Sequence, residues 1–406
     1  MTAVSTAVDL TDVRLFAENR HHEAFRRLRE ESPVYWNPCA DGTGFWALTK
    51  YDDVLAAYHD HEVFSSAHGA ILGGSFRKGG DTASGEMLVA SDLPRHRMLR
   101  RAMQTLFNPT TVNRMANQIR VLLNRAVINI RDAGGCDFAL EFAPLLPIGA
   151  LMTLFGIGHD DARHIVDLTR KMVGYRDAAL SDLSGDERIR LAHAQSEILE
   201  FFADLLEERR ANSTDDVIGL LLRSDVNGEG MSDSQIIYNC MNIAVGGNET
   251  SSYTTCSGFL ALLENPGEWH RLRADPGLLP TAIEEMLRWS STNAYVQRIA
   301  VRDTVVRHTR IAAGDAVTLW NVSANRDPEQ FPEPDRFDIT RTPNRHLSFG
   351  YGIHRCIGAR AGNAEINEAF TALLRSGLDF ELKDDPTRLH SNFILGFTSM
   401  PIEVSA

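Results

Sequence analysis

The feature that most constrains this chain is a glycine-rich segment around a single cysteine near its C-terminal end. The segment reads Phe349-Gly350-Tyr351-Gly352-Ile353-His354-Arg355-Cys356-Ile357-Gly358. Glycines allow the backbone to turn sharply and to approach a ligand closely. Backbone N–H groups and adjacent cations stabilise a thiolate. The segment therefore indicates a loop that holds a cysteine thiolate against a flat cofactor. A buried structural cysteine in a tight turn is the alternative.

Composition indicates a globular chain without an obvious internal boundary. Of 406 residues, 43% are hydrophobic, and no low-complexity linker or internal repeat divides them. The five cysteines are widely spaced and form no Cys-x-x-Cys pair, which favours a reducing, cytoplasmic location over a disulfide framework. A net charge of −13 argues against nucleic-acid binding. We see no basic leader and no apolar stretch approaching about 18 residues, so we expect neither a signal peptide nor a membrane span.

Helical periodicity dominates the chain. Apolar residues recur at three- and four-residue spacing in the ranges 113–132, 191–211, 231–264, 277–289 and 360–376. Strand-like stretches are short and fall at 45–49, 296–300, 316–320 and 393–398. Dense Pro and Gly in 326–358 predict a long ordered coil. The pattern predicts a mainly α (α+β) fold in a single domain over residues 1–406.

The range 231–264 is predicted to be one long helix with an unusual centre. Ser232 and Gln235 match a capping box, and Asn265-Pro266 ends the pattern. Gly246 and Gly247 lie in its middle, where each glycine costs about 1 kcal/mol relative to alanine. Either the helix leaves room for a ligand there, or another helix packs closely against the glycines, with the Thr250 hydroxyl bonding back to the Gly246 carbonyl.

The cysteine segment, written Phe-Gly-x-Gly-x-His-x-Cys-x-Gly, resembles the haem-binding loop of the cytochrome P450 family, with every motif position filled. The run Gly-Gly-x-Glu-Thr at 246–250 resembles that family's oxygen-binding groove. The resemblance implies haem b, with Cys356 as the axial ligand of its iron, where a thiolate favours O–O cleavage. It further implies that Gly246 and Gly247 leave space for dioxygen, that Thr250 donates a hydrogen bond to it, and that Glu249 helps to relay protons.

Further residues match the family's supporting positions. Glu285 and Arg288, with Arg336 in the following coil, resemble its structural triad. His96 and Arg100 lie one helical turn apart and resemble its propionate-binding pair. With these, the resemblance implies that the residues contacting the haem are His96, Arg100, Arg298, His354, Phe349, Gly350 and Gly358. The run 359–363, Ala-Arg-Ala-Gly-Asn, departs from the family's usual sequence after the cysteine.

Variable segments are expected to surround the substrate. The glycine-rich range 65–86 predicts a mobile loop, and 173–188 predicts a lid between two helices. Candidates for the pocket wall are Ala244, Asn293, Tyr295, Val296, Phe393 and Ile394, for which core packing is the alternative. Their mixture of apolar and polar side chains indicates an organic substrate of mixed polarity.

The resemblance implies a soluble bacterial-type monooxygenase, folded as a triangular prism of helices with small sheets. It would oxidise an organic small molecule, such as a polyketide, peptide, terpenoid or carrier-bound amino acid. A haem-binding sensor or carrier without turnover, and a peroxide-using variant, are the alternatives. No flavin or iron–sulfur motif is present, so electrons would come from a separate donor, a ferredoxin with its reductase. The arginines that could dock an acidic ferredoxin are Arg97, Arg101, Arg355 and Arg360.

Overall fold

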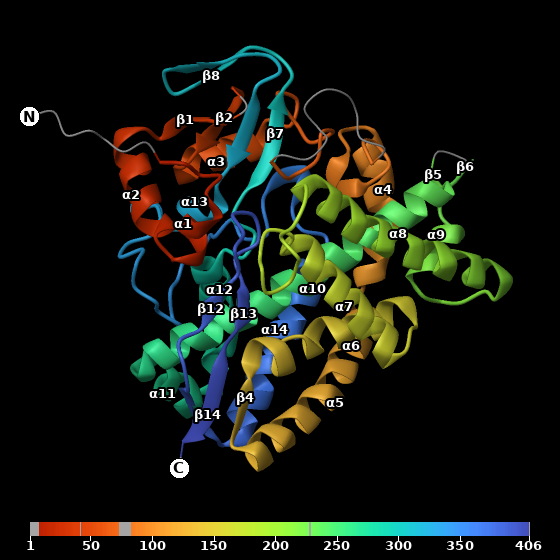
Figure 1. Cartoon of the computed structure of the whole chain (residues 1–406), viewed down its shortest axis with the longest axis vertical. Coiled ribbons are helices and arrows are strands. Elements are labelled where there is room, and N and C mark those ends of the chain that lie inside the picture. The colour runs from red at the N-terminus through yellow and green to blue at the C-terminus, as the bar shows by residue number, and fades with distance from the viewer. Residues whose placement is uncertain (1–7, 41, 73–82, 227–228, 406) are drawn as a thin grey trace, which may run out of the picture.

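The computed structural model describes residues 8–40, 42–72, 83–226 and 229–405 (Figure 1). Its α-helices are α1 (Val13–Ala17), α2 (His21–Glu31), α3 (Tyr51–His59), α4 (Arg95–Gln104), α5 (Pro109–Ala133), α6 (Leu145–Phe155), α7 (His159–Val173), α8 (Glu187–Ala211), α9 (Val217–Leu222), α10 (Asp233–Glu264), α11 (Pro266–Ala274), α12 (Leu279–Ser290), α13 (Asn321–Ala324) and α14 (Ala359–Ser376). Short 3-10 turns and one π-helical turn, η4 (Phe138–Phe142), connect some of them.

The strands are short and gather mostly on one side of the molecule (Figure 1). They are β1 (Val34–Pro38), β2 (Gly44–Leu48), β3 (Phe64–Ser65), β4 (Gly135–Asp137), β5 (Asp225–Val226), β6 (Glu229–Gly230), β7 (Val296–Ala300), β8 (Thr304–Val306), β9 (Thr309–Ile311), β10 (Ala316–Leu319), β11 (Asp379–Leu382), β12 (Thr387–Arg388), β13 (Phe397–Ser399) and β14 (Pro401–Ser405). The largest sheet has the order β1-β2-β10-β7-β3, in which β10 runs parallel to β2 and the other pairs are antiparallel.

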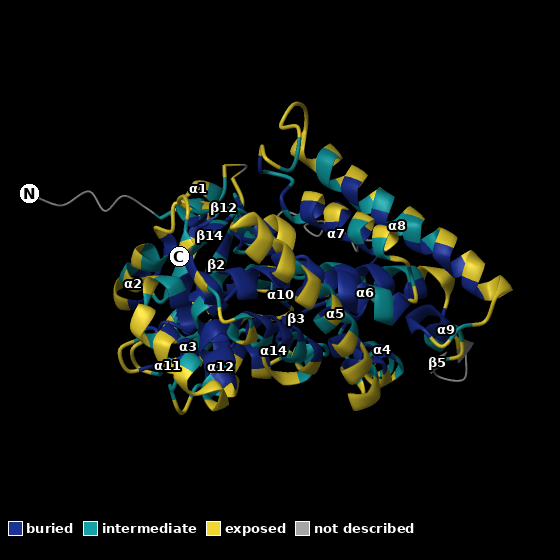
Figure 2. Cartoon of the chain, turned by 90° about the horizontal axis from the view of Figure 1, so that it is seen from below, coloured by how far each residue is buried: buried dark blue, intermediate teal, exposed yellow. Residues whose placement is uncertain are grey.

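Helix α10 crosses the centre of the molecule, and its middle and C-terminal parts are mostly buried (Figures 1 and 2). The predicted capping box is confirmed, because the Ser232 side chain accepts from the Gln235 N–H while the Gln235 side chain accepts from the Ser232 N–H. Helices α6, α7, α8, α12 and α14 contact it. A central helix with this many neighbours is apolar on most of its circumference, which explains its weak amphipathic pattern.

The predicted elements agree with the structure in type but not always in extent. The five predicted helices correspond to α5, α8, α10, α12 and α14, with ends shifted by a few residues. The predicted strand at 393–398 is wrong for its first half. There, Asn293 and Ile394 form an isolated bridge, and the regular strand β13 starts only at Phe397.

One expectation about apolar segments is wrong. The stretch Phe138–Phe155 is 18 residues long with a mean hydropathy of 1.7, which are the length and composition of a membrane span. In the structure this stretch comprises the π-helical turn η4 and helix α6, and 78% of it is buried inside the fold. A helix surrounded by other helices is hydrophobic all round, and this burial accounts for the composition.

Candidate functional site

The cysteine segment forms a tight loop immediately before α14. Gly350 and Gly352 have φ angles of +62° and +67°, a region that favours glycine. A Cβ atom on Gly352 would come within 2.7 Å of the Tyr58 carbonyl oxygen in α3. The Cys356 N–H donates to the Phe349 carbonyl at 2.8 Å and closes the loop. Glycine is therefore required by the backbone conformation and by the close contact with α3.

The Cys356 thiol lies in a mixed electrostatic environment. Surrounding protein raises its pKa by desolvation, and Glu365 adds to this effect. A backbone N–H of Gly358 and the guanidinium groups of Arg100 and Arg355 act in the opposite direction and lower the pKa. The Gly358 N–H and the two guanidinium groups would stabilise the thiolate that forms when a metal ion replaces the thiol proton.

Four basic side chains from three separate segments meet near this loop. His96 and Arg100 lie on α4, Arg298 on β7, and His354 in the cysteine loop. The imidazole rings of His96 and His354 have centroids 4.2 Å apart. The Arg100 guanidinium donates to the Arg355 carbonyl at 2.8 Å, which connects α4 to the cysteine loop. The structure thus brings together four of the residues that the resemblance assigned to the haem, including its propionate-binding pair His96 and Arg100.

These four side chains fit a dianionic group. The Nε2 atoms of His96 and His354 are buried and have no hydrogen-bond partner. Arg298 is 5% exposed, and among the described residues no carboxylate forms an ion pair with it. Burial lowers the pKa of His96 to about 4 and also lowers that of His354, and nearby arginine charges add to both effects. Burying cations and unpaired hydrogen-bond donors costs free energy unless an anion lies beside them. The two propionates of haem would be such anions.

The glycine pair on α10 faces open space. Gly246 and Gly247 are exposed, and a Cβ atom added to either would meet nothing within 4 Å. The alternative of close helix packing at the glycines is therefore wrong. The helix continues without interruption from Asp233 to Glu264. The Thr250 hydroxyl donates to the Gly246 carbonyl at 2.7 Å, which holds the side chain against the helix beside the glycines.

Glu249 lies on a different side of α10 from the glycines. Its side chain is 1% exposed, and its carboxylate lies 3.5 Å from the Arg170 guanidinium of α7. The Thr169 hydroxyl also donates to it at 3.2 Å. Burial raises the pKa of Glu249, and the positive charge of Arg170 opposes that change. Glu249 is therefore held toward α7 by an ion pair.

A second buried acid, which the sequence analysis missed, lies behind the groove. Glu365 of α14 is 4% exposed, and burial raises its pKa to about 8. The Ser251 hydroxyl lies 2.5 Å from Glu365 Oε2 and 3.1 Å from the Gly247 carbonyl. Because the raised pKa keeps Glu365 protonated at neutral pH, the acid can donate to Ser251 Oγ and leave the Ser251 hydrogen for the Gly247 carbonyl. Its sequence signal is an acid on the apolar face of the predicted helix 360–376.

The expected structural triad needs one correction. Glu285 and Arg288 form the predicted pair, fully buried, through two hydrogen bonds of 2.7 Å. The Arg336 side chain, however, is exposed and pairs with Glu333. Arg341 takes its place, with Nε 3.1 and 3.2 Å from the two Glu285 oxygens. Arg336 contributes only its carbonyl, which accepts from Arg288 and Arg341.

The pocket-wall candidates divide into two groups. Asn293, Val296 and Phe393 are half-buried. The other three are core residues, which corrects the prediction: Ala244, Tyr295 and Ile394 are 0%, 1% and 4% exposed. Tyr295 packs between Trp320 and Phe393, and Ile394 packs with Tyr253 and Leu389.

Ala244 is excluded by its burial, not by its direction alone. At about 100° per residue it lies about 160° from Gly246 but about 60° from Gly247, and its side chain is fully buried in the core. Asn242 and Ile243 are partly exposed, each within a turn of the glycine pair, and the sequence analysis missed them. The 3.6-residue period, applied from the glycines, would have found them.

Of the expected loop at 65–86, residues 73–82 lie outside the described ranges. The range 174–186 does connect α7 to α8, as predicted.

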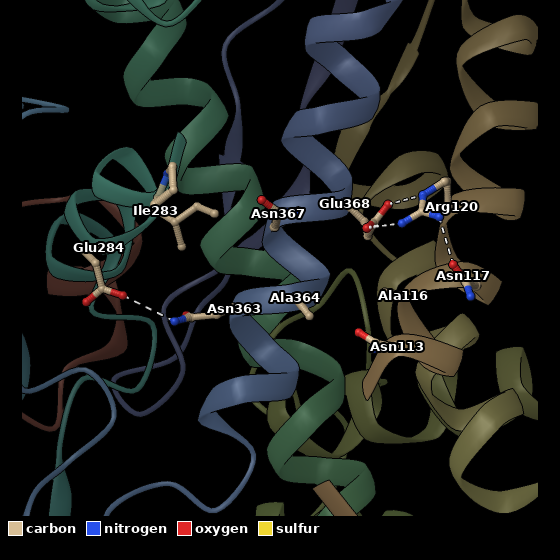
Figure 3. Close-up of a pocket in the computed structure, with 11 residues that line it drawn as sticks. Asn113, Ala116, Asn117, Arg120, Ile283, Glu284, Asn363, Ala364, Asn367 and Glu368 are labelled. Atoms are coloured by element: carbon tan, nitrogen blue, oxygen red, sulfur yellow. Dashed lines mark hydrogen bonds and ion pairs between the residues drawn. The ribbon is translucent and has the colours of Figure 1, made fainter. Parts of the chain in front are cut away.

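A groove on the described part of the surface lies apart from this site. It has a volume of about 660 Å³ and lies between α5, α12 and α14. Figure 3 shows Arg120 paired with Glu368 on one side and Asn363 bonded to Glu284 on the other. None of the haem-site candidates lines it. Asn363 belongs to the run that departs from the usual family sequence, and here it tethers α14 to α12.

Comparison with known proteins identifies the family. Residues 10–405 match the family described as Cytochrome P450. The chain belongs to the cytochrome P450 family. It is 34% identical to cytochrome P450 NovI of Streptomyces niveus over 98% of this chain and 96% of that protein. It is 35% identical to a methyl-branched lipid omega-hydroxylase of Mycobacterium tuberculosis over 93% of this chain and 90% of that protein.

Solved structures agree with this assignment. A Mycobacterium marinum P450 in complex with pseudoionone superposes with a TM-score of 0.89, at 30% identity and 98% coverage of each chain. The mainly α P450 fold expected from the resemblance is thereby confirmed. The chain is a P450 monooxygenase, and P450 enzymes use a haem whose iron carries a thiolate ligand. Bacterial P450s receive their electrons from separate redox partners.

Proposed function

We propose that this P450 oxidises a natural-product intermediate of mixed polarity, with Cys356 as the iron ligand and α10 as the wall that binds oxygen. The observation that carries the proposal is the cysteine loop lying beside a buried cluster of four basic side chains. When bound, the haem supplies the activation of dioxygen by its thiolate-ligated iron. The protein supplies the ligand, the anion-binding groups and a controlled path for protons.

The assignment of the propionate site follows from hydrogen-bonding capacity. Arg100 and Arg298 are permanent cations, and His96 and His354 are neutral above their lowered pKa values and keep one N–H each. Guanidinium groups bind carboxylates through pairs of hydrogen bonds. Phe349, Gly350 and Gly358 would surround the sulfur, because they hold the loop in which Cys356 sits.

Proton delivery would use the polar groups on two sides of α10. Thr250 would turn its hydroxyl from the Gly246 carbonyl toward bound oxygen. Glu249 would exchange protons with bulk water only when its ion pair with Arg170 opens. The Ser251–Glu365 pair carries a proton at neutral pH on the opposite side of Gly247. Of these groups, Thr250 lies nearest the glycine pair, so it is the group we expect to contact oxygen.

The iron ligand is tested by the absorbance of the reduced, CO-bound protein. The thiolate-ligated form is expected for the wild type, and Cys356→Ala should lose it while far-UV circular dichroism stays unchanged. A spectrum of histidine-ligated haem in the wild type would contradict the assignment. Substrate-dependent NADPH consumption with surrogate redox partners and an oxygenated product would exclude a sensor or carrier role. Turnover with peroxide alone, unchanged in Thr250→Ala, would favour the peroxide-using variant.

The substrate class is inferred from the half-buried wall. The half-buried candidates combine the amide groups of Asn242 and Asn293 with the apolar side chains of Ile243, Val296 and Phe393, and the Asn293 Oδ1 atom is buried without a partner. A substrate that carries both apolar surface and a hydrogen-bond donor fits such a wall. Among similar proteins, one at 28% identity is described as involved in the biosynthesis of vancomycin-type antibiotics. We therefore favour a polyketide, peptide, terpenoid or carrier-bound amino acid.

A ligand panel measured by the spin-state shift of the ferric haem tests this inference. We expect the tightest binding from functionalised natural-product intermediates, and Asn293→Val should weaken that binding more than the binding of a plain hydrocarbon. Tight binding confined to unsubstituted fatty acids would contradict a role in natural-product tailoring. We place the enzyme in the cytoplasm, because none of its five cysteines forms a disulfide in the described structure.

The electron donor is proposed to be a ferredoxin that docks on a basic surface, which we call the arginine face. It consists of Arg97 and Arg101 on α4, Arg355 in the cysteine loop and Arg360 on α14, all exposed. No described carboxylate pairs with any of the four, whereas neighbouring Arg95 pairs with Glu86. The hydrogen bond from Arg100 to the Arg355 carbonyl joins the two halves of this face beside the iron ligand.

Charge reversal tests the arginine face. Arg97→Glu and Arg101→Glu should each slow reduction by ferredoxin several-fold at low salt, and the difference should shrink as ionic strength rises. Arg375→Glu is the matched control, because Arg375 is exposed on α14 and lies about 22 Å along that helix from Arg360. Substrate binding should stay unchanged in all three variants. A reduction rate that does not depend on ionic strength would refute electrostatic docking.

A further inference from the structure

A separate cavity of about 200 Å³ lies away from the haem-site residues. It is enclosed by the start of α2, the C-terminal part of α10, the end of α12 and the segment 388–396. None of the groups assigned to haem, oxygen or electron transfer lines it. Organic ligand pockets usually span about 300–1,000 Å³, so this cavity suits a smaller molecule. Its charged and titratable lining consists of His21, His22, Glu264, Arg326 and Arg388.

Two arginines and one glutamate line the cavity, and both arginines keep guanidinium donors without a described partner there. The Arg388 guanidinium lies 4.9 Å from the centre of the Phe397 ring and forms no ion pair with any described carboxylate. Glu264 faces the same cavity, but it stays beyond ion-pair distance from Arg388. Arg326 stacks on Trp289 at 3.9 Å and donates to Asp335 at 3.0 Å through Nη1, while its Nε has no partner. Guanidinium donors therefore remain unused around the cavity.

His21 supplies a second, independent indication of a ligand. Its side chain is 3% exposed, and neither ring nitrogen is within hydrogen-bond geometry of a partner, although the Leu15 backbone acts on the ring and opposes the effect of burial on its pKa. The ring is held by stacking on Phe16, at 5.1 Å between centroids. Burial lowers the pKa of His21 to about 3, so the ring is neutral and presents one N–H donor. His21 also begins α2, whose first turn has no side-chain cap and carries one acid, Glu23, so its backbone N–H groups remain available to an anion on the cavity side.

We propose that this cavity binds a small oxyanion, either inorganic phosphate or a small carboxylate. Arg388 and the free Nε of Arg326 provide charged donors, His21 provides a neutral one, and the first turn of α2 provides backbone N–H groups. A strongly hydrated metal cation is disfavoured by the two guanidiniums. A substrate of the size that P450 enzymes oxidise exceeds the volume. A single oxyanion satisfies the unpaired donors that the fold buries here.

Occupancy would stabilise a specific junction of the fold. The oxyanion would join the N-terminal helix α2 to the ends of α10 and α12 and to Arg388. The segment after Arg388 lines the cavity with Leu395 and Gly396 and includes Phe393, a half-buried candidate for the substrate wall. Oxyanion binding is therefore expected to raise thermal stability and to order the segment that carries this wall residue.

The test compares sodium phosphate, sodium acetate, sodium succinate and sodium chloride at equal pH and ionic strength, using the haem-loaded protein. Phosphate or a carboxylate should raise the Tm above the chloride value and give a saturable heat in titration calorimetry. A larger rise in Tm with phosphate than with acetate and succinate would identify phosphate as the ligand, and the reverse order would identify a small carboxylate. Equal Tm in all four salts, with no saturable heat, would overturn the proposal.

Two variants localise the effect. Arg388→Gln removes a charged donor, and His21→Phe removes the neutral donor while keeping the stacked ring. Both should lose the anion-dependent rise in Tm. Arg14→Gln, at an exposed arginine on α1, should keep it. The CO-bound spectrum verifies that each variant folds. If Arg388→Gln does not fold, the result for His21→Phe decides the test. Saturable binding that persists unchanged in a folded His21→Phe or Arg388→Gln variant would show that the anion binds elsewhere and would overturn the assignment.

Discussion

Replacing Glu365 by glutamine should make this P450 more stable in mild alkali than the wild type. Burial raises the pKa of Glu365 to about 8, so the acid is protonated at neutral pH, and its proton can then bond Ser251 Oγ while the Ser251 hydrogen serves the Gly247 carbonyl. A glutamine amide donates to Ser251 in the same place but cannot ionise. Glu365→Gln therefore mimics the protonated acid and removes its dependence on pH.

The magnitude follows from the raised pKa. The folded protein keeps the Glu365 proton up to a pKa of about 8, whereas the unfolded chain releases it near the ordinary value of 4.5. Between these values the folded state binds more protons, so stability falls as pH rises. At about 1.4 kcal/mol per pH unit, the loss between them is about 5 kcal/mol. The unfolding entropy of a chain of 406 residues converts 1 kcal/mol into about 1 °C, so the expected difference in Tm is about 5 °C.

The assay is the Tm of the haem-loaded wild type and Glu365→Gln, measured at pH 5 and at pH 8.5. We expect nearly equal values at pH 5 and a variant about 5 °C higher at pH 8.5. Glu368→Gln is the control on the same helix. It breaks the ion pair with Arg120 and should lower the Tm at both pH values. A difference between wild type and Glu365→Gln that is the same at pH 5 and pH 8.5 would refute a protonated Glu365.

Two further predictions concern the network around Glu285 and the groove on α10. Arg341→Ala should lower the free energy of unfolding by about 3–5 kcal/mol, because it breaks a buried ion pair. Arg336→Ala should change it by less than about 0.5 kcal/mol. Urea titrations measure both variants, and equal losses would contradict the assignment of Arg341. Gly247→Ala should raise the Tm by about 1 °C through helix propensity and lower the product formed per NADPH consumed, because its methyl group enters the open space beside Thr250. An unchanged product yield in Gly247→Ala would show that this space is not used by oxygen.

Local signals in the sequence predicted the long helices well. The capping box at Ser232 and the Asn265-Pro266 pair placed the ends of α10 within two residues. These signals act over three or four residues and need no knowledge of the rest of the fold. The bridge between Asn293 and Ile394 depends instead on two segments about a hundred residues apart, and no local pattern encodes their register. For that reason the predicted strand at 393–398 was wrong in its first half.

The same distinction separates the site residues that motifs could predict from those they could not. His96, Arg298 and His354 converge as the family resemblance implied. Whether Arg336 or Arg341 reaches Glu285 depends on the path of the coil between them. The structure selects Arg341, whose guanidinium also donates to the carbonyls of Pro332 and Glu333 and so fixes that path. A motif gives the residue type in such a coil, but the backbone turns decide which side chain points inward.

The convergence of cations at the cysteine loop also connects cofactor binding to stability. Burying Arg298 without an ion pair costs several kcal/mol, and each unpaired Nε2 atom of His96 and His354 adds a desolvation cost. The fold tolerates these costs because packing elsewhere holds the residues in place, as in the stack of the Arg298 guanidinium over the Tyr58 ring at 5.9 Å. Two carboxylates at this position would offset the costs together. Replacing Arg298 should therefore lower the haem affinity and the Tm of the haem-loaded protein together, whereas loss of the Cys356 thiolate should alter the absorbance spectrum more than the Tm.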